Sequence, residues 1–354
     1  MSKKNNKNSK YLGLSVHYRK RHNQQRAIYY CKMAIKQRDS DAMNDLGDFY
    51  DTELKDYKRA IKYYKIGIKK QNLYAMSNLA YLYYDIYDDI SKAIYYYKMA
   101  IRKKFSDAMF LLGYLYEEKK KYKKAICYYY MATKYDYMEA FNNLALIYHH
   151  ETKEFEKAKK YYKLGVKKED NKAMVNLALL YEKHYQDYDN AIKYYKMAIE
   201  YEHDSALFNL ALLYEEDKLR EYKKAIKYYK MSIEKYNDSE AMFNLAILYK
   251  EQYKDYNNAM KYYKMAIEDG CYRSMNNLGI IYKNQFKDLK KAIEYYKMAI
   301  EKGNDVLAMY NLAELYEEEY QDYKKAQKYY EMALENGYEE AREKLDRIKK
   351  GSRR

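Results

Sequence analysis

The sequence repeats one short phrase along most of its length. An Ala is followed four residues later by a Leu, then by a small residue next to that Leu, and by a Tyr three residues further on. Successive Leu residues are 32 to 35 positions apart, and a fixed period of that length is typical of stacked helical repeats. The anchoring residues are Leu46, Leu79, Leu112, Leu144, Leu177, Leu210, Leu245, Leu278, Leu312 and Leu345.

A second phrase, such as KAIEYYKMAIE, alternates with the first. In both phrases the apolar residues recur three and four positions apart, which predicts two amphipathic helices per period. The position seven residues after the Ala of the second phrase is always small, so the backbone of another helix must pass close to it. Its members are Gly67, Ala100, Ala132, Gly165, Ala198, Ser232, Ala266, Ala299 and Ala333.

The predicted fold is an all-α, right-handed superhelical solenoid of antiparallel helical hairpins, with about nine to ten repeats. The chain of 354 residues has no Pro and only 10 Gly, so Asp- and Asn-rich links such as QDYDN must supply the helix caps. We expect a single solenoid over residues 24–348, beginning with an unpaired second helix near residue 24. Residues 1–23 and 349–354 are expected to be basic tails, the first of them flexible.

The combined pattern A…NLG..Y…KAI.YY.MAIE.G resembles Sel-one-like repeats, which are relatives of tetratricopeptide repeats. Residues 262–282, YYKMAIEDGCYRSMNNLGIIY, carry this resemblance most clearly. The 12 residues from Ala266 to Leu278 follow the pattern of that family, and Gly270, Gly303 and Gly337 stand at its link glycine. The link inside each hairpin is shorter than in that family, and the Pro of the tetratricopeptide signature is missing. The resemblance covers residues 25–347 and implies a protein-binding scaffold.

No residue pattern indicates chemistry. The three Cys residues are far apart, the six His residues have no metal-ligand spacing, and the Gly residues form no phosphate-binding loop. We therefore expect a protein that is not an enzyme, with no cofactor, no metal and no small-molecule substrate. Because there is no signal peptide or membrane span, we expect a cytoplasmic location. The excess of Lys and Tyr suggests an AT-rich genome.

Thirty-three of the 54 Tyr residues occupy repeat positions, where they are expected to pack as Phe or Trp would elsewhere. The residues two before and two after the anchoring Leu point away from the hairpin core. They are apolar in the central repeats, and Asn recurs immediately before the Leu. The predicted partner-binding groove comprises Leu146, Val175, Asn176, Leu179, Phe208, Asn209, Leu212, Phe243, Asn244, Ile247, Asn277 and Ile280.

Two interpretations of this stripe stay open at the level of sequence. An apolar surface flanked by amide side chains suits an extended apolar or amphipathic protein segment, which would make the chain a scaffold or adaptor. Alternatively, the apolar residues pack against the neighbouring first helix and the Asn side chains bond to the adjacent repeat.

The net charge of +16 lies mostly at the ends of the chain. Residues 1–26 contain eight Lys or Arg and no acid, whereas residues 342–354 contain seven basic and two acidic residues. The alternative function is therefore a basic-tailed module recruited weakly to nucleic acid or to an anionic membrane surface. Fifty-six Lys against twelve Arg disfavour bidentate phosphate recognition in the body of the chain.

Overall fold

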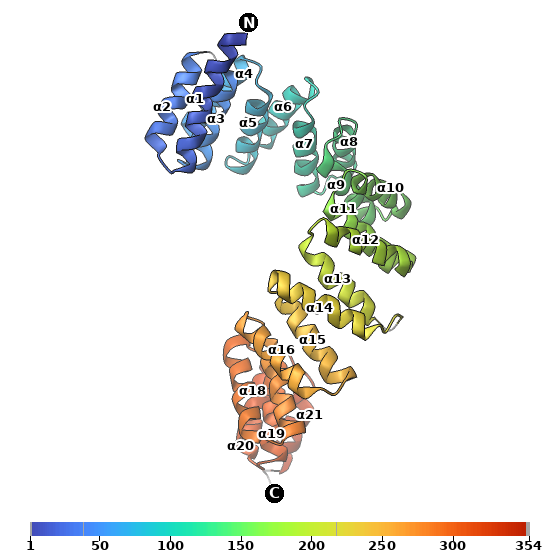
Figure 1. The fold of residues 1–354 in the computed structure, drawn as a ribbon. Coiled ribbons are helices and arrows are strands. Elements are labelled where there is room, and N and C mark those ends of the chain that lie inside the picture. Colours follow the sequence, from blue (N-terminus) through green and yellow to red (C-terminus); the bar gives the residue numbers. More distant parts are fainter. Residues whose placement is uncertain (1, 38, 217, 352–354) are drawn as a thin grey trace. The chain divides into compact units, whose positions relative to one another are not determined.

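The computed structural model describes residues 2–37, 39–216 and 218–351, and its regular elements over those ranges are all helices. The chain divides into two units, Met1–Leu180 and Tyr181–Arg354, and in each of them helical hairpins follow one another along the chain (Figure 1). The predicted all-α repeat fold is confirmed.

The first unit contains alternating first and second helices. The first helices are α1 (Ser2–Lys20), α3 (Ser40–Thr52), α5 (Leu73–Asp85), α7 (Ser106–Glu118), α9 (Met138–Leu146), which continues into the π-helical turn η1 (Ile147–Glu151), and α11 (Asn171–Leu180). The second helices are α2 (Gln24–Lys36), α4 (Tyr57–Lys69), α6 (Ile90–Ile101), α8 (Tyr122–Thr133) and α10 (Phe155–Val166).

The second unit begins with the π-helical turn η2 (Tyr181–Tyr185) and continues with the same alternation. The second helices are α12 (Tyr188–Glu200), α14 (Tyr222–Tyr236), α16 (Tyr256–Glu268), α18 (Leu289–Gly303) and α20 (Tyr323–Glu335). The first helices are α13 (Asp204–Glu215), α15 (Ser239–Gln252), α17 (Arg273–Ile281) with the π-helical turn η3 (Tyr282–Phe286), α19 (Val306–Glu318) and α21 (Ala341–Gly351).

Tyrosine rings and small residues fill the core. The second Tyr of each second-helix doublet is less than 2 % exposed, and the preceding Tyr stacks on the Tyr that ends the first-helix phrase. In the hairpin of η2 and α12, for example, the rings of Tyr181 and Tyr194 are parallel within 6° and their centroids are 5.7 Å apart. The fully buried tyrosines are Tyr64, Tyr97, Tyr129, Tyr162, Tyr195, Tyr229, Tyr263, Tyr296 and Tyr330.

Close helix contacts explain the small residues of the second helices. A Cβ atom added to Gly67 would lie 2.9 Å from the Cβ of Ala75, and one added to Gly165 would lie 2.7 Å from that of Ala173. Each contact joins a second helix to the first helix of the next hairpin. Since a larger side chain has no room there, these positions hold adjacent hairpins at a short and constant spacing.

An acidic N-cap, a cation and a Tyr ring recur where second helices begin. In α18, the backbone N–H of Lys291 donates to the Asp288 carboxylate at 3.1 Å, and the Lys291 ammonium lies 3.1 Å from the same group and 5.2 Å from the centroid of the Tyr282 ring. The pairs of this type are Asp56–Arg59, Asp89–Lys92, Glu154–Lys157, Glu221–Lys224, Asp288–Lys291 and Asp322–Lys325. At α8 the N-cap is Lys121, which makes no side-chain cap.

The links turn through left-handed backbone conformations with very little glycine. Seventeen non-Gly residues of the described chain have a positive φ, whereas only Gly270 and Gly337 do so among the glycines. Gly303, which we expected at the link, lies instead at the end of α18, and Asn304 adopts the left-handed conformation with φ 46°. Each non-Gly residue in this region carries a conformational cost that the packed helices offset.

The N-terminal segment differs from our expectation. Instead of a tail followed by an unpaired helix, residues 2–20 form α1, which packs along α2. Tyr18 stacks on Tyr30 with centroids 5.4 Å apart, and the Ser15 hydroxyl donates to the carbonyl of Ala27 at 3.0 Å. The tyrosine stacking reproduces that of later hairpins. Lys10 replaces the usual Ala before the anchoring position, Leu14, so the sequence pattern failed to reveal this hairpin.

The C-terminal helix α21 packs on α20 and extends to Gly351, three residues beyond the predicted end of the solenoid. Its buried residues Ala341, Leu345 and Ile348 join the core formed by α19 and α20. The last part of the predicted C-terminal tail, residues 352–354, lies outside the described residues.

Candidate partner-binding surface

We define the helix-one face as the surface formed by three positions of each first helix, two before, one before and two after the anchoring Leu. In the first unit the predicted groove residues on this face are Leu146, Val175, Asn176 and Leu179. The side chains of Leu146 and Leu179 are half-buried, whereas Val175 is only 5 % exposed. Val175 therefore contributes to packing and offers almost no surface to a partner.

In the second unit the predicted groove residues are exposed or half-buried. Leu212 on α13 is 36 % exposed, and Ile247 on α15 and Ile280 on α17 are half-buried. Phe208 and Phe243 are also half-buried, with their ring centroids 6.0 Å and 5.9 Å from those of core tyrosines Tyr229 and Tyr263. One side of each Phe ring therefore packs inward, while the remainder contributes to the helix-one face.

Asparagine side chains link successive first helices at some repeats. Asn176 donates to the Asn142 side chain at 2.8 Å, and Asn311 donates to Asn276 at 2.9 Å. In each bond the donor Asn immediately precedes an anchoring Leu. The acceptor Asn lies two residues before the anchoring Leu of the preceding repeat. Asn176 is thus already engaged within the protein, as the packing interpretation expected, because the preceding repeat offers an amide acceptor.

The other predicted Asn residues, Asn209, Asn244 and Asn277, have a different environment. In the repeat before each of them, the position of the amide acceptor is occupied by an apolar residue, which is Val175, Phe208 or Phe243. Asn244 lies near the Tyr229 hydroxyl, and Asn277 makes only a long bond of 3.5 Å to its own helix. Asn209 is half-buried and has no hydrogen-bond partner among the described residues. The amides that remain available for a partner are therefore on α13 and its neighbours in the second unit, next to Leu212.

The tyrosine hydroxyls reveal a pairing that the sequence analysis did not identify. Five core tyrosines donate to a carboxylate five residues after an anchoring Leu, as Tyr195 does to Glu182 at 2.7 Å. The other pairs are Tyr64–Asp51, Tyr129–Glu117, Tyr229–Glu215 and Tyr330–Glu317. Burial raises the pKa of Glu117 and Glu215, although the Tyr hydrogen bond opposes the shift. A search for acids at that offset would have found the pairs.

Four core tyrosines have no acid at that offset, and Tyr263 is one of them. Its hydroxyl is buried and has no hydrogen-bond partner among the described residues. The residue five positions after its anchoring Leu245 is Lys250, which pairs with Glu251 at 2.9 Å. A lysine is only a donor, so it cannot accept the Tyr263 proton.

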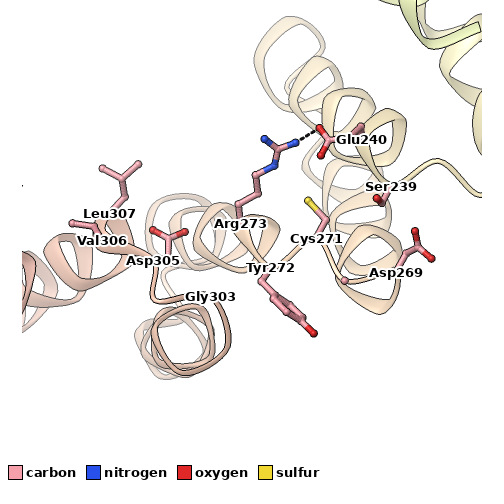
Figure 2. A pocket seen from close by; sticks show the side chains of 11 residues that line it. Ser239, Glu240, Asp269, Cys271, Tyr272, Arg273, Gly303, Asp305, Val306 and Leu307 are labelled. Atoms are coloured by element: carbon pink, nitrogen blue, oxygen red, sulfur yellow. Dashed lines mark hydrogen bonds and ion pairs between the residues drawn. The ribbon is translucent and has the colours of Figure 1, made fainter. Parts of the chain in front are cut away.

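A hollow of about 680 Å³ lies in the second unit at the N-terminal ends of α15, α17 and α19 (Figure 2). Arg273 points from α17 toward Glu240 of α15, with which it forms an ion pair, and its guanidinium lies 4.1 Å from the centroid of the Phe243 ring. Cys271 also lines the hollow, and the Ser274 hydroxyl is 3.7 Å from its sulfur. The residues that line the hollow include no histidine that could deprotonate this thiol.

Across the described residues there is no group of three or more His, Cys, Asp or Glu side chains that could hold a metal ion. None of the described helices combines the length and the apolar character required to cross a bilayer.

The repeats match known protein families over most of the chain. The Sel1 repeat matches residues 11–39, 40–72, 73–105, 106–134, 171–200, 239–271, 273–304 and 306–338. The chain belongs to the Sel1 repeat family. Tetratricopeptide repeats match residues 139–167 and 186–240. No curated protein matches the sequence.

Solved structures show the same fold. A protective antigen present in uropathogenic Escherichia coli strains, which displays an SLR fold, is 23 % identical with a TM-score of 0.59, over 96 % of this chain and 79 % of the antigen. A Sel1 repeat protein from Oxalobacter formigenes is 17 % identical with a TM-score of 0.60, over 81 % of this chain and 90 % of that protein. Sel1 and tetratricopeptide repeat proteins generally mediate protein–protein interactions and are generally not enzymes.

Proposed function

We propose that this Sel1 repeat protein is a non-catalytic scaffold or adaptor that binds an apolar or amphipathic protein segment on its helix-one face. The observation that carries the proposal is the environment of Leu212, a large apolar side chain that is 36 % exposed. It lies one turn from Asn209, whose amide has no hydrogen-bond partner in the part of the chain that the structure describes. An apolar contact beside a free donor and acceptor can hold both a side chain and the backbone of an extended segment.

The neighbouring repeats extend this surface within the second unit. Ile247 and Ile280 are half-buried at the positions equivalent to Leu212, and the partly exposed Phe208 and Phe243 lie on the same faces of α13 and α15. Leu146 and Leu179 hold the equivalent positions in the first unit. Asn176 and Val175 support the surface from within, since one is hydrogen-bonded and the other is buried.

The test replaces Leu179, Leu212 and Ile247 by Asp and compares the proteins captured from the native host by wild type and variant. Because these side chains are partly exposed, we expect loss of the specific partner with an unchanged helical circular dichroism spectrum. The matched control is K196D/K264D, which places acids on exposed positions of second helices and should keep the partner. Loss of helicity in the triple variant would show instead that the apolar stripe is needed for packing.

Salt separates this proposal from recruitment through basic tails. Capture by an apolar surface should persist in 0.5 M NaCl, whereas binding through basic tails should collapse. The structure favours the first mode, because cations of the C-terminal helix are already paired within the protein. Lys344 lies 2.9 Å from Glu314, Lys349 lies 3.0 Å from Glu331, and Arg347 pairs with Glu317.

A further inference from the structure

A second hollow, of about 520 Å³, lies in the first unit between the second helices α6 and α8. Four cationic side chains line it, Lys98 and Arg102 from the C-terminal end of α6 and Lys123 and Lys124 from the start of α8. No carboxylate lines it. Its volume falls within the range of about 300–1,000 Å³ that small-molecule sites occupy.

The charge of this hollow is not neutralised by neighbouring residues. None of the four cations forms an ion pair among the described residues, in contrast to the equivalents of Lys124 in six other repeats, which pair with an acidic N-cap. The N-cap of α8 is Lys121, so Lys124 lacks that carboxylate and lies 5.2 Å from the centroid of the Tyr116 ring. The local break in the repeat therefore leaves a concentrated positive charge at one place.

The surrounding helices reinforce this charge. The second helices α4, α6 and α8 contain nine Lys or Arg residues and no acid, and only Arg59 and Lys92 among these nine pair with N-cap acids. The first helices α3, α5 and α7 contain eight Asp or Glu residues and no cation. An anion approaching this part of the unit is therefore attracted to the side formed by the second helices and repelled from the other.

The apolar part of the hollow is formed by Ile101, Met131 and two tyrosines. Tyr116 is buried and stacks on the half-buried Tyr128, with centroids 5.6 Å apart. We propose that the hollow binds a small organic phosphate, with the phosphate groups held by the four cations and a flat apolar group resting against Tyr128. This ligand site goes beyond the proposed protein-binding function and uses no residue of the helix-one face.

Cys127 provides a direct readout of occupancy, because this exposed thiol lines the hollow. The experiment measures alkylation of the full chain by iodoacetamide, resolved by peptide mass spectrometry, in the presence of ADP, pyrophosphate or adenosine. We expect ADP to slow alkylation of Cys127 most, pyrophosphate to slow it less and adenosine to have no effect. Cys271, which lies in the other unit, is the internal control and should react equally in all samples.

Two variants test the charge requirement. K98E/R102E should weaken ADP protection by at least about tenfold, because it removes two charge-assisted contacts and introduces repulsion. The matched control K196E changes the residue equivalent to Lys98 in another repeat and should leave protection unchanged. K121D restores the acidic cap of the other repeats, so it should weaken protection about threefold by engaging Lys124 while raising the Tm.

Three results would overturn the proposal. One is equal protection by NaCl at matched ionic strength, and another is unchanged ADP protection in K98E/R102E. The third is protection by vesicles containing anionic lipid without any effect of ADP or pyrophosphate, which would assign the hollow to a membrane surface. None of these results bears on partner capture by Leu212 and its neighbours.

Discussion

At the scale of single residues, the core tyrosines are polar groups that the protein must satisfy. A buried hydroxyl without a partner costs about 1–3 kcal/mol, and five repeats avoid this cost with an acid five residues after the anchoring Leu. The sequence predicted that these rings are buried, but not which atoms receive their hydroxyl protons, because the acceptor comes from the opposite helix of the hairpin.

The unpaired hydroxyl of Tyr263 leads to a prediction of increased stability. Lys250→Glu should place a carboxylate beside the Tyr263 hydroxyl, at the position that Glu182 holds relative to Tyr195. The new hydrogen bond should raise the free energy of unfolding by about 1 kcal/mol. Thermal or urea denaturation measures the effect. In a protein that already carries Y263F, K250E should give no gain, because the hydroxyl is missing. An equal gain with and without the hydroxyl would contradict the proposed bond.

A left-handed link residue provides a second test. Gln321 has φ 53°, a region that disfavours residues with a Cβ atom, so Gln321→Gly should stabilise the protein by about 1 kcal/mol. The reciprocal control is Gly337→Ala, where φ is 90° and open space surrounds the added Cβ, so only backbone strain is introduced. Denaturation should show opposite shifts for the two variants, and shifts of the same sign would contradict this explanation.

At the scale of helices, adjacent hairpins are held together by the small residues of the second helices. Ala198 is completely buried at the position equivalent to Gly165, which lies against Ala173. Ala198→Leu should therefore overpack the contact and lower the stability by about 1–3 kcal/mol, measured as a lower Tm. Lys196→Leu, an exposed site on the same helix, is the control and should leave the Tm nearly unchanged.

The stability of the hairpin formed by α7 and α8 should depend on pH through the carboxyl group of Glu117. Burial raises its pKa above the ordinary value of 4.5, so the folded state favours the protonated acid more than the unfolded state does. The stability that this group contributes is present at low pH and is lost as the pH rises through its raised pKa. Relative to Glu117→Gln, the wild-type protein should therefore gain stability as the pH falls from 7 toward 4.5.

The measurement is the difference in Tm between the two proteins across this range. Their difference removes the general effect of the positive net charge, since both proteins share it. A difference that stays constant as the pH falls from 7 to 4.5 would contradict the assigned shift. The bond from Tyr129 should survive in the variant, because the amide oxygen of the substituted side chain can also accept a proton from the hydroxyl.

At the scale of the whole molecule, each unit is a series of neighbour contacts, and its terminal helix acts as a cap. Leu345 and Ile348 on α21 are each 5 % exposed and bury the outer surface of α20 and α19. The double variant L345D/I348D should lower the free energy of local unfolding. The expected loss is about 2–5 kcal/mol for each buried aliphatic side chain that is removed. Hydrogen exchange should accelerate first in α19 and α20, whereas uniform acceleration along the chain would contradict neighbour-only coupling.

The sequence by itself determined the period, the two helices of each hairpin and the residues that face its core. These features follow from spacing along single helices, so residues such as Leu177, Tyr195 and Ala198 could be assigned before any coordinates. The extra first helix escaped the pattern because Lys10 stands at one of its key positions.

Only the tertiary structure decided which helix-one residues are open. Val175, Phe208 and Phe243 all stand two residues before an anchoring Leu, yet Val175 is 5 % exposed and the two Phe side chains are half-buried. Asn176 is bonded to Asn142, whereas Asn209 has no partner in the described chain, since Val175 stands at the sequence position that Asn142 holds one repeat earlier. Periodicity determines the direction of a side chain from its own helix axis, but exposure depends on what the adjacent hairpin places opposite it.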